Sequence, residues 1–238
     1  MTAATVYLDR RFYPGVVGNW DDQMFREEIL QRIDSSTALL DVGAGAGIVA
    51  DMNFQGLAGR VCGVDLDERV LENPALDDAR VASAEEIPYP DSSFDLVFSD
   101  NVLEHLAEPG VVFAEIARVL KPGGLFLFKT PNRRHYMPLI ARLTPHRFHQ
   151  FVNRIRGREA VDTFPTLYRA NSRRQVDRLA KETGFDVISL SFVEGRPEYL
   201  RMFWPTYAVG IAYERLVNSS SFFSSWRILM IGMLRKSL

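Results

Sequence analysis

Short apolar runs alternate with helical patterns along most of the chain. Seven runs indicate strands, because each is rich in β-branched, aromatic or leucine side chains and is bounded by glycine, proline or polar residues. They are Thr37–Val42, Arg60–Asp65, Arg80–Ala82, Phe94–Ser99, Gly124–Lys129, Phe185–Val193 and Arg227–Leu234. Strands that alternate with helices favour a parallel sheet with helices on both faces. The pattern therefore predicts an α/β fold.

Helices are expected between these strands, where apolar residues recur at intervals of three and four. In Pro109–Leu120 the apolar positions share one helical face, and Pro122-Gly123-Gly124 ends the segment. Ser172 opens another helix in a Ser-Arg-Arg-Gln sequence with the form of a capping box, and Gly184 lies just past its end. Two further helices are predicted, over Trp20–Ile33 and from Pro205 to Val217.

Composition and charge limit the class of protein. The chain has 238 residues, of which 47% are hydrophobic and 24% charged, as in globular proteins. The net charge of −2 gives no overall case for nucleic-acid binding, and the single cysteine cannot form an intramolecular disulfide. The first residues lack the apolar core of a signal peptide, and no run approaches the roughly 18 apolar residues of a membrane span. We therefore expect a cytoplasmic protein.

One stretch, LLDVGAGAGIVA at residues 39–50, places an acid at the end of a buried strand and directly before a glycine-rich turn. Ligands of such sheets bind beyond the carboxyl ends of the strands. Dinucleotide sites use G-x-G-x-x-G/A, a turn aimed at a pyrophosphate, whereas here Asp41, Gly43, Gly45 and Gly47 form D-x-G-x-G-x-G. A carboxylate would repel phosphate but suits a cation. S-adenosylmethionine (SAM) carries an ammonium and a sulfonium, so the turn favours SAM.

Four landmarks in order resemble the class I SAM-dependent methyltransferases of the type 11 group. They are LLDVGAGAG, the Asp65 that closes VCGVD, the stretch VASAEEIPYPDSSFDLVFSDNVLEHL, and ARVLKPGGLFLF. The resemblance covers about Leu39 to Asn132, with a weaker tail to the C-terminus. It implies a Rossmann-like, seven-stranded, mostly parallel sheet with an antiparallel last strand and a basic helical lid after strand five. It also implies SAM as cofactor and S-adenosylhomocysteine as product.

Carried onto this chain, the resemblance implies a set of cofactor-binding residues. Asp65 matches the acid that binds the ribose hydroxyls, whereas Ser83 stands where the family usually has an acid that binds the adenine amino group. The whole set is Asp41, Gly43, Ala44, Gly45, Gly47, Asp65, Leu66, Ser83, Ala84, Glu85, Ser99, Asp100 and Asn101.

We expect a single methyltransferase domain over residues 1–238. Within it, residues 1–36 form an N-terminal cap, 37–130 the cofactor-binding core and 131–170 the acceptor lid. Residues 171–238 supply the C-terminal part of the sheet, with an aromatic insert at 197–226.

Two features of the sequence limit which element the acceptor atom can be. The Asn/Asp-Pro-Pro-Tyr loop used on amino groups of bases is absent after strand four, where Ser99-Asp100-Asn101-Val102 stands, and Cys62 lies mid-strand as a small core residue. An oxygen of a small molecule or saccharide is therefore the leading acceptor. His105 and His135 are the candidate catalytic residues, as base or acceptor clamp; for His105 simple packing beside the cofactor is the alternative. Relatives with Glu-x-x-Glu-His at His105 bind Mg²⁺, but Asn101 replaces the first glutamate, so no metal is expected.

A basic stretch, Lys129–Arg158, holds eight Lys or Arg, no Asp or Glu, and three of the four histidines. Its position after strand five predicts an acceptor lid, with acceptor-binding residues Arg133, Arg134, Tyr136, His146 and His149. Such a lid suits an anionic acceptor, for example a phosphorylated sugar, a nucleotide sugar or a lipid-linked saccharide. The same lid resembles TPHRFH-like segments of chains from bacterial surface-polysaccharide pathways. A solvated basic face is the alternative.

Three functions remain open: an O-methyltransferase of small molecules or saccharides, an RNA 2′-O-methyltransferase, and a non-catalytic SAM-binding interaction protein. No RNA-binding module is recognisable, so nucleic acid is not the expected partner. The aromatic insert has two interpretations. In the first, its helix packs on the sheet or forms a dimer contact. In the second, it is a surface that touches a lipid monolayer at the inner membrane face. The oligomeric state is not predicted.

Overall fold

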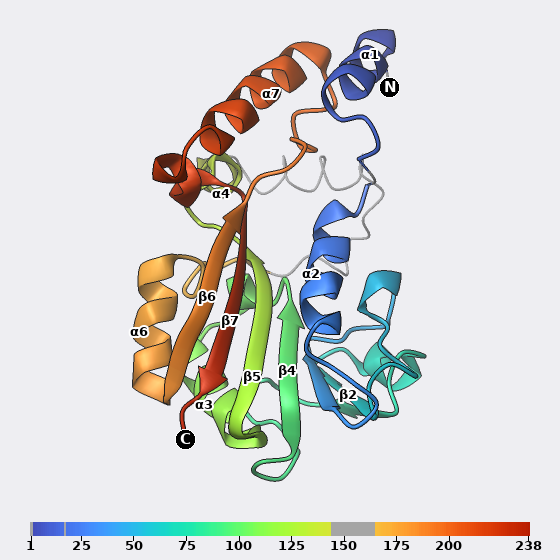
Figure 1. Cartoon of the computed structure of the whole chain (residues 1–238), viewed down its shortest axis with the longest axis vertical. Helices are drawn as coiled ribbons and strands as arrows, with labels where there is room; N and C mark the ends of the chain where they lie inside the picture. The colour runs from blue at the N-terminus through green and yellow to red at the C-terminus, as the bar shows by residue number, and fades with distance from the viewer. Residues whose placement is uncertain (1, 17, 144–164) are drawn as a thin grey trace. The chain divides into compact units, whose positions relative to one another are not determined.

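The computed structural model describes residues 2–16, 18–143 and 165–238. The chain divides into two compact units (Figure 1). The sheet unit comprises Asp22–Thr130, Pro165–Ser191 and Ile231–Leu238. The helical unit comprises Met1–Asp21, Pro131–Phe164 and Phe192–Met230. The predicted core lies in the sheet unit, which also takes residues 22–36 of the predicted N-terminal cap.

Seven strands form one sheet in the order β3-β2-β1-β4-β5-β7-β6. The pairs β1–β2, β1–β4, β2–β3 and β4–β5 are parallel. Strand β7 lies between β5 and β6 and runs in the opposite direction (Figure 1). The predicted seven-stranded, mostly parallel sheet with an antiparallel last strand is confirmed. The strands are β1 Ala38–Val42, β2 Arg60–Asp65, β3 Asp78–Val81, β4 Phe94–Asp100, β5 Leu120–Pro131, β6 Phe185–Val193 and β7 Leu229–Lys236.

The register brings the carboxyl ends of the central strands to one edge. Val42 of β1 pairs with Val64 of β2, and Asp41 pairs with Phe98 of β4. The strand order reverses at β1, because β2 lies on one side of it and β4 on the other. This is the switch point where sheets of this class bind ligands, so the glycine turn after β1 lies where the sequence predicts it.

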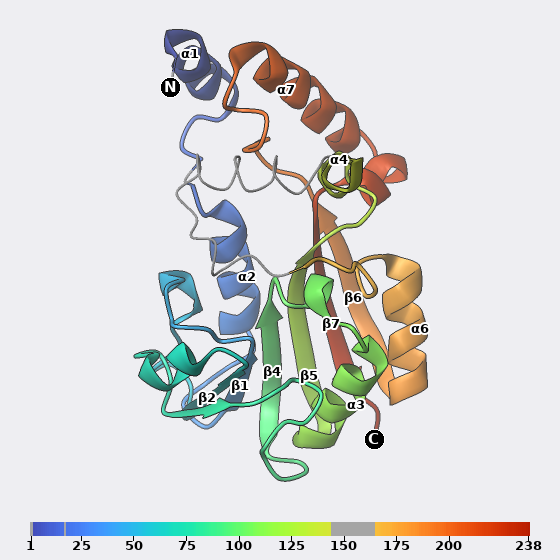
Figure 2. The ribbon, with the colours of Figure 1, turned by 180° about the vertical axis from the view of Figure 1, so that it is seen from behind.

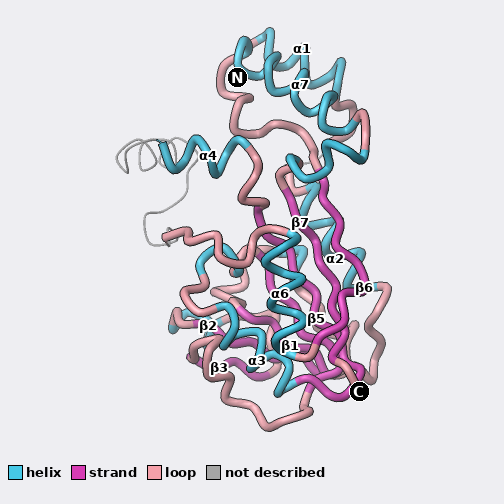
Figure 3. Tube along the Cα trace, turned by 90° about the vertical axis from the view of Figure 1, so that its left-hand side faces the viewer, coloured by secondary structure: helices cyan, strands magenta, loops and turns pink. Residues whose placement is uncertain are grey.

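Helices cover both faces of the sheet. Phe25 of α2 (Trp20–Leu30) meets Phe98 edge-on, with ring centres 6.4 Å apart. Phe113 of α3 (Pro109–Val119) meets Phe126 of β5 at 5.4 Å. Phe98 pairs with Leu127, the neighbour of Phe126, so Phe98 and Phe126 point to opposite faces. Helix α6 (Arg173–Thr183) lies beside α3 (Figures 2 and 3). Short 3₁₀ segments are η1 Ala50–Met52, η2 Glu68–Glu72, η3 Leu103–His105 and η5 Ser221–Trp226.

Several predicted boundaries differ from the observed ones. Strand β5 begins at Leu120 instead of Gly124, because Leu120 pairs with Phe94 and the Pro-Gly-Gly turn becomes an irregularity within the strand pairing. Helix α2 ends at Leu30 instead of Ile33. Ser172 does precede α6, but its hydroxyl donates to the Gln175 side chain (2.7 Å) and accepts no backbone N–H, so the capping box is incomplete.

The helical unit contains α1 (Ala3–Phe12), α4 (Tyr136–Leu143) and α7 (Trp204–Asn218). Helices α1 and α7 lie side by side in all three views (Figures 1–3). They are joined by Tyr207, whose hydroxyl donates to Asp9 (2.6 Å), and by Tyr13, which donates to Glu214 (3.0 Å). The helix predicted from Pro205 to Val217 is confirmed as α7. No helix within the described residues has the length and apolar character that crossing a membrane requires.

Candidate functional site

The carboxyl group of Asp41 lies nearly buried at the carboxyl end of β1. Only 7% of the residue is exposed, and its side chain forms no hydrogen bond or ion pair with any described residue. Burial raises the pKa of this carboxyl well above its usual range, and the charges of Asp100 and Asp65 raise it further. Three acids from three adjacent strands thus share one edge of the sheet. A bound cation would stabilise this arrangement, and a phosphate would not.

The turn after β1 requires glycine at its first position. Gly43 has a φ of +86°, and an added Cβ would lie 2.3 Å from a methyl group of Val102. Gly45 also has positive φ, at +49°, but its Cβ would meet only Asp65 Oδ2, at 4.0 Å. The backbone at Gly45 therefore faces open space on its Cα side, which lets a ligand approach closely. The predicted residues Gly43, Ala44, Gly45 and Gly47 all belong to this turn.

Asp65 is held in place by backbone amides. Gly45 N donates to Oδ2 and Asp67 N donates to Oδ1, both at 2.8 Å. The carboxylate thus joins the end of β2 to the glycine turn after β1. Each oxygen keeps a further lone pair that a ribose hydroxyl could use. Leu66 follows Asp65 and is 70% exposed, so it offers an apolar surface beside that carboxylate.

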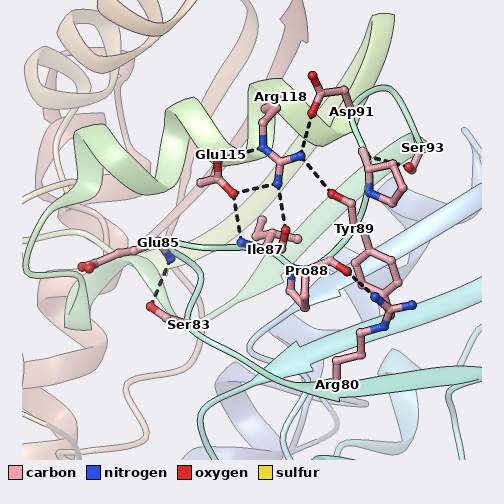
Figure 4. A network of polar contacts seen from close by, with 11 residues as sticks. Arg80, Ser83, Glu85, Ile87, Pro88, Tyr89, Asp91, Ser93, Glu115 and Arg118 are labelled. Carbon is pink, nitrogen blue, oxygen red and sulfur yellow. Dashed lines mark hydrogen bonds and ion pairs between the residues drawn. The ribbon is translucent and has the colours of Figure 1, made fainter.

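The predicted adenine loop is fixed from behind by two residues of α3 (Figure 4). Glu115 accepts a hydrogen bond from Ile87 N (2.9 Å), and Arg118 donates to the carbonyls of Ile87 (2.8 Å) and Tyr89 (2.9 Å). Arg118 also pairs with Glu115 and with Asp91, both at 2.8 Å, and these two carboxylates raise its pKa. A pocket adjoins the loop, lined by residues 81–83 and 86–88 and by the same two side chains of α3.

Glu115 and Arg118 were not among the site residues predicted from the sequence. The one available signal was their i, i+3 spacing on a predicted helix, which usually indicates a solvated surface pair. Of the predicted adenine-loop residues, Glu85 is exposed and Ala84 is half-buried. The Ser83 hydroxyl already accepts a hydrogen bond from Glu85 N (3.1 Å), so it caps a local turn.

Strand β4 ends in a polar group that includes a buried lysine. Lys129 of β5 has no exposed surface; its Nζ lies 3.0 Å from Asp100 Oδ1 and also contacts Asp22 of α2. The basic stretch of the sequence begins at Lys129, but this lysine belongs to β5, as predicted, and is paired with two acids of the sheet unit. Asn101 donates to Asp100 (2.8 Å) and has a φ of +55°, an uncommon value for a non-glycine residue. Such strain often marks a functional position.

A chain of hydrogen bonds leads to the buried Glu104 beside His105. Asn171 Nδ2 donates to Thr130 Oγ1 (2.6 Å), so the Thr130 hydroxyl proton is directed to Glu104 Oε2 (2.9 Å). Burial raises the pKa of Glu104, which is 4% exposed. The backbone carbonyl of Glu104 accepts from Leu167 N (2.6 Å) and Tyr168 N (3.1 Å). These contacts fix the segment that begins at Pro165 against the end of β4.

His105 lies at the same end of β4, with 30% of its side chain exposed. Its Nδ1 is 2.9 Å from the carbonyl oxygen of Pro165. A carbonyl only accepts, so Nδ1 carries the proton of the neutral ring and Nε2 carries the lone pair. Nε2 lies 3.9 Å from Glu104 Oε1. In this tautomer Nε2 is the acceptor atom of the ring.

His135 is placed differently from the prediction that it faces an acceptor. It belongs to the helical unit and has no exposed surface. Its Nδ1 accepts from Met137 N (3.2 Å), and its Nε2 lies 3.3 Å from Glu194 Oε2 without the alignment of a hydrogen bond. The rings of Tyr136 and Tyr213 lie 4.0 and 5.5 Å away. Burial raises the pKa of Tyr213 to about 12, so its hydroxyl stays protonated. The histidine is thus a core residue of this unit.

The other predicted acceptor residues follow β5 directly. Arg134 is exposed, whereas Arg133 and Tyr136 are half-buried. Asn132 anchors this stretch, because its side chain donates to the carbonyls of Ser225 and Arg227, both at 2.8 Å. His146 and His149 lie outside the described residues. Within the part of the chain that is described, no three His, Cys, Asp or Glu side chains are grouped so as to hold a metal ion.

Comparison with known proteins connects this site to a family. Residues 40–128 match the family described as methyltransferase domain. The chain is 30% identical over 177 residues to a ubiquinone biosynthesis O-methyltransferase of Thiobacillus denitrificans, covering 67% of this chain and 68% of that protein. It is 38% identical over 148 residues to a probable S-adenosylmethionine-dependent methyltransferase of Mycolicibacterium smegmatis. That match covers 58% of this chain and 56% of the relative, so the chain spans about half the length of the relative.

A solved structure has a similar fold. The geranyl diphosphate C-methyltransferase of Streptomyces coelicolor, in complex with S-adenosylhomocysteine, has a TM-score of 0.56 at 18% identity. The similarity covers 91% of this chain and 78% of that one. The same family is indicated by the order of the strands, by the three acids at the switch point and by the sequence relatives. The chain belongs to the SAM-dependent methyltransferases.

Proposed function

We propose that this methyltransferase transfers the methyl group of SAM to an oxygen atom of a small, anionic acceptor, such as a saccharide or a lipid-linked saccharide. The observation that carries the oxygen acceptor is the hydrogen bond between His105 Nδ1 and the Pro165 carbonyl. It leaves the lone pair on Nε2 at the end of β4, and a hydroxyl acceptor must give up a proton to such a group. The sequence relative named as an O-methyltransferase supports the same chemistry.

The cofactor would bind at the acid cluster of the sheet unit. Asp41, which has no partner among the described residues, supports a place for a cationic part of SAM near Asp65 and Asp100. Asp65 would accept from the ribose hydroxyls, and exposed Leu66 would contact the adenine. The amides of Ala84 and Glu85 would bind the adenine edge, because the Ser83 hydroxyl is already engaged. Ser99 and Asn101 would line the same edge of the sheet.

The transfer is an in-line displacement. When bound, SAM would supply an electrophilic methyl carbon: the acceptor oxygen would bond to it, the carbon–sulfur electron pair would stay on sulfur, and neutral S-adenosylhomocysteine would leave. His105 Nε2 would take the acceptor proton. Holding the two reactants in line supplies on the order of 7–11 kcal/mol, and the base a further 10²- to 10⁴-fold in rate.

The proposal of an anionic acceptor is based on the positive charge of the residues that follow β5. Arg133 and Arg134 follow β5, next to the strand end that carries Lys129 and Thr130. A guanidinium binds a phosphate or carboxylate in two-point contact, which favours an anionic acceptor. Tyr136 and, in the residues outside the description, His146 and His149 complete the proposed set. His135, being buried, would position Tyr136 and would not act as the base.

Mass spectrometry tests this proposal. The enzyme is incubated with trideuteromethyl-labelled SAM, EDTA and separate pools of phosphorylated sugars, nucleotide sugars, lipid-linked saccharides and RNA. We expect label on an oxygen of an anionic saccharide, and kcat reduced about 10²-fold or more in His105→Ala with SAM affinity kept. Label only on nitrogen or carbon, or only on RNA, contradicts the proposal. SAM binding without turnover in every pool would indicate a non-catalytic protein.

A further inference from the structure

The exposed charges of the helical unit are all basic within its described residues. None of its five described acids is exposed, and they are Asp9, Asp21, Glu194, Glu198 and Glu214. Four arginines of the same unit are exposed, and they are Arg10, Arg11, Arg134 and Arg215. The surface of this unit therefore presents positive charge without neighbouring exposed carboxylates.

Internal pairing explains why the acids are withdrawn. Asp9 accepts hydrogen bonds from Arg201 (3.1 Å) and from the Tyr207 hydroxyl (2.6 Å). Glu214 accepts from Tyr13 (3.0 Å) and from Asn218 (2.7 Å). These carboxylates join α1 to α7 and face inward. Of the four exposed arginines, Arg215 pairs with Glu214 (3.3 Å), whereas Arg10, Arg11 and Arg134 form no ion pair with a described residue.

Helix α7 adds an apolar face that no described residue covers. Val209 is 66% exposed and Leu216 is 50% exposed, and the exposed Ala208 and Ala212 lie on the same side of the helix. The opposite face of α7 is the buried one, formed by Tyr207, Gly210, Ile211, Glu214 and Val217. Exposed aromatic side chains flank the helix: Phe203 (64%), Trp204 (53%) and Phe222 (81%).

The charge separation extends over the whole chain. The sequence of the helical unit holds 13 Lys or Arg against 7 Asp or Glu, whereas that of the sheet unit holds 15 against 23. The unit that carries the apolar helix face therefore has a positive net charge, although the net charge of the whole chain is −2.

We propose that the exposed face of α7, together with Arg10, Arg11 and Arg215, binds the surface of an anionic lipid membrane. Apolar and aromatic side chains enter the boundary between headgroups and acyl chains, and arginines bind the acidic headgroups. Tryptophan next to such a face is typical of membrane interfaces. A second copy of the same face is disfavoured because it would bring these arginines against their own like charges. The inference does not depend on which acceptor the enzyme methylates.

Vesicle co-sedimentation with the full chain tests the proposal. The vesicles contain phosphatidylcholine alone or phosphatidylcholine with phosphatidylglycerol. We expect binding to the anionic vesicles only, with a blue shift of tryptophan fluorescence. Binding should weaken strongly at about 1 M salt, where the screening length falls to about 3 Å.

Two variants separate the charge from the apolar face. Arg10→Gln/Arg11→Gln should weaken binding to anionic vesicles by about 10- to 30-fold, since each basic residue near such a surface is worth about 1 kcal/mol. Val209→Ser/Leu216→Ser should remove the fluorescence shift and most of the salt-resistant binding. The matched control is Arg174→Gln/Lys181→Gln, which makes the same charge change at exposed positions of α6 in the sheet unit. Circular dichroism and SAM binding should be unchanged in all three.

Three results would overturn the proposal. The first is equal sedimentation with and without anionic vesicles. The second is a loss in the α6 control as large as that in Arg10→Gln/Arg11→Gln, because binding would then follow overall charge only. The third is a wild-type dimer in light scattering that Val209→Ser/Leu216→Ser converts to monomer while vesicle binding is absent, because the face would then meet a second copy of the chain.

Discussion

The Nζ atom of Lys129 lies 3.0 Å from Oδ1 of Asp100, and the lysine has no exposed surface. Its other partner, Asp22, belongs to α2. One buried cation therefore connects the first helix of the sheet unit with the strand end that enters the proposed cofactor site.

Removing this buried cation should lower the free energy of unfolding. In Lys129→Met the carboxylates of Asp22 and Asp100 lose their shared counter-charge while staying largely buried. We expect a loss of about 3–5 kcal/mol in the free energy of unfolding, measured by urea denaturation. The exposed Lys181→Met on α6 serves as control and should change stability by less than about 0.5 kcal/mol. A Lys129→Met protein as stable as wild type would show that the buried pair carries no net stabilisation.

Asp41 should reduce the stability of the ligand-free protein at neutral pH. Its pKa is raised in the folded state, so folding favours the protonated carboxyl. The stability from this group is fully present below the unfolded pKa of about 3.9 and is lost as the pH rises through the higher folded pKa. Asp41→Asn should therefore raise the melting temperature at pH 8 more than at pH 5, and should weaken SAM binding. Equal shifts at both pH values would contradict the assigned titration.

The cofactor assignment makes a separate prediction about affinity. Asp65→Ala removes an acceptor of the proposed ribose contact, worth about 1.5–3 kcal/mol as a charged hydrogen bond, or about 10- to 150-fold in Kd. Gly45→Val fills the space that the backbone leaves open and should abolish binding. Calorimetry with SAM measures both, and Asp186→Ala, an exposed acid of β6, is the control. Unchanged affinity in both variants would refute the site.

Arg118 should act on the cofactor through the loop that it holds. In Arg118→Ala the carbonyls of Ile87 and Tyr89 lose their donor, and Glu115 loses a partner (Figure 4). We expect weaker SAM binding, by roughly 5- to 30-fold, and faster amide hydrogen exchange over residues 83–91. Exchange that stays at the wild-type rate, with weaker binding, would mean that Arg118 acts on the cofactor in another way.

Arg133 and Arg134 should contribute to the use of the acceptor and not to the affinity for SAM. The double variant Arg133→Ala/Arg134→Ala should keep SAM affinity and lower kcat/KM for the acceptor by about 10- to 150-fold, as a charged contact of roughly 1.5–3 kcal/mol gives. Steady-state kinetics with a verified acceptor measures this. Wild-type kinetics in the double variant would make these arginines part of a solvated face.

Much of the sheet could be predicted from the sequence because local patterns determine it. Buried parallel strands are continuous apolar runs, so β1 and β2 were located to within one residue. Long-range pairing determines the rest. Leu120 reads as the end of a helix, yet it pairs with Phe94 and so begins β5. The residues of the glycine turn were found because their spacing itself encodes the backbone conformation.

The site was predicted where one residue type implies one chemistry, and missed where a contact across the fold determines the role. Lys129 stands next to basic residues in sequence, and only the packing of α2 and β4 shows that it is buried between two acids. His135 reads as a lid residue, and only its contact with Glu194, 59 positions later, makes it part of a core. No local pattern contains either contact.

The position of β7 has a consequence for how the chain folds during its synthesis. Strand β6 is an edge strand whose one neighbour in the sheet is β7, yet β7 comes 35 residues later in the sequence. While a ribosome is making residues 194–228, β6 has no partner and β5 presents an open edge on that side. The pairings of β7 with β5 and β6 are therefore the last to form. A nascent chain that stalls in this interval would leave β6 and the open edge of β5 unpaired and prone to aggregation.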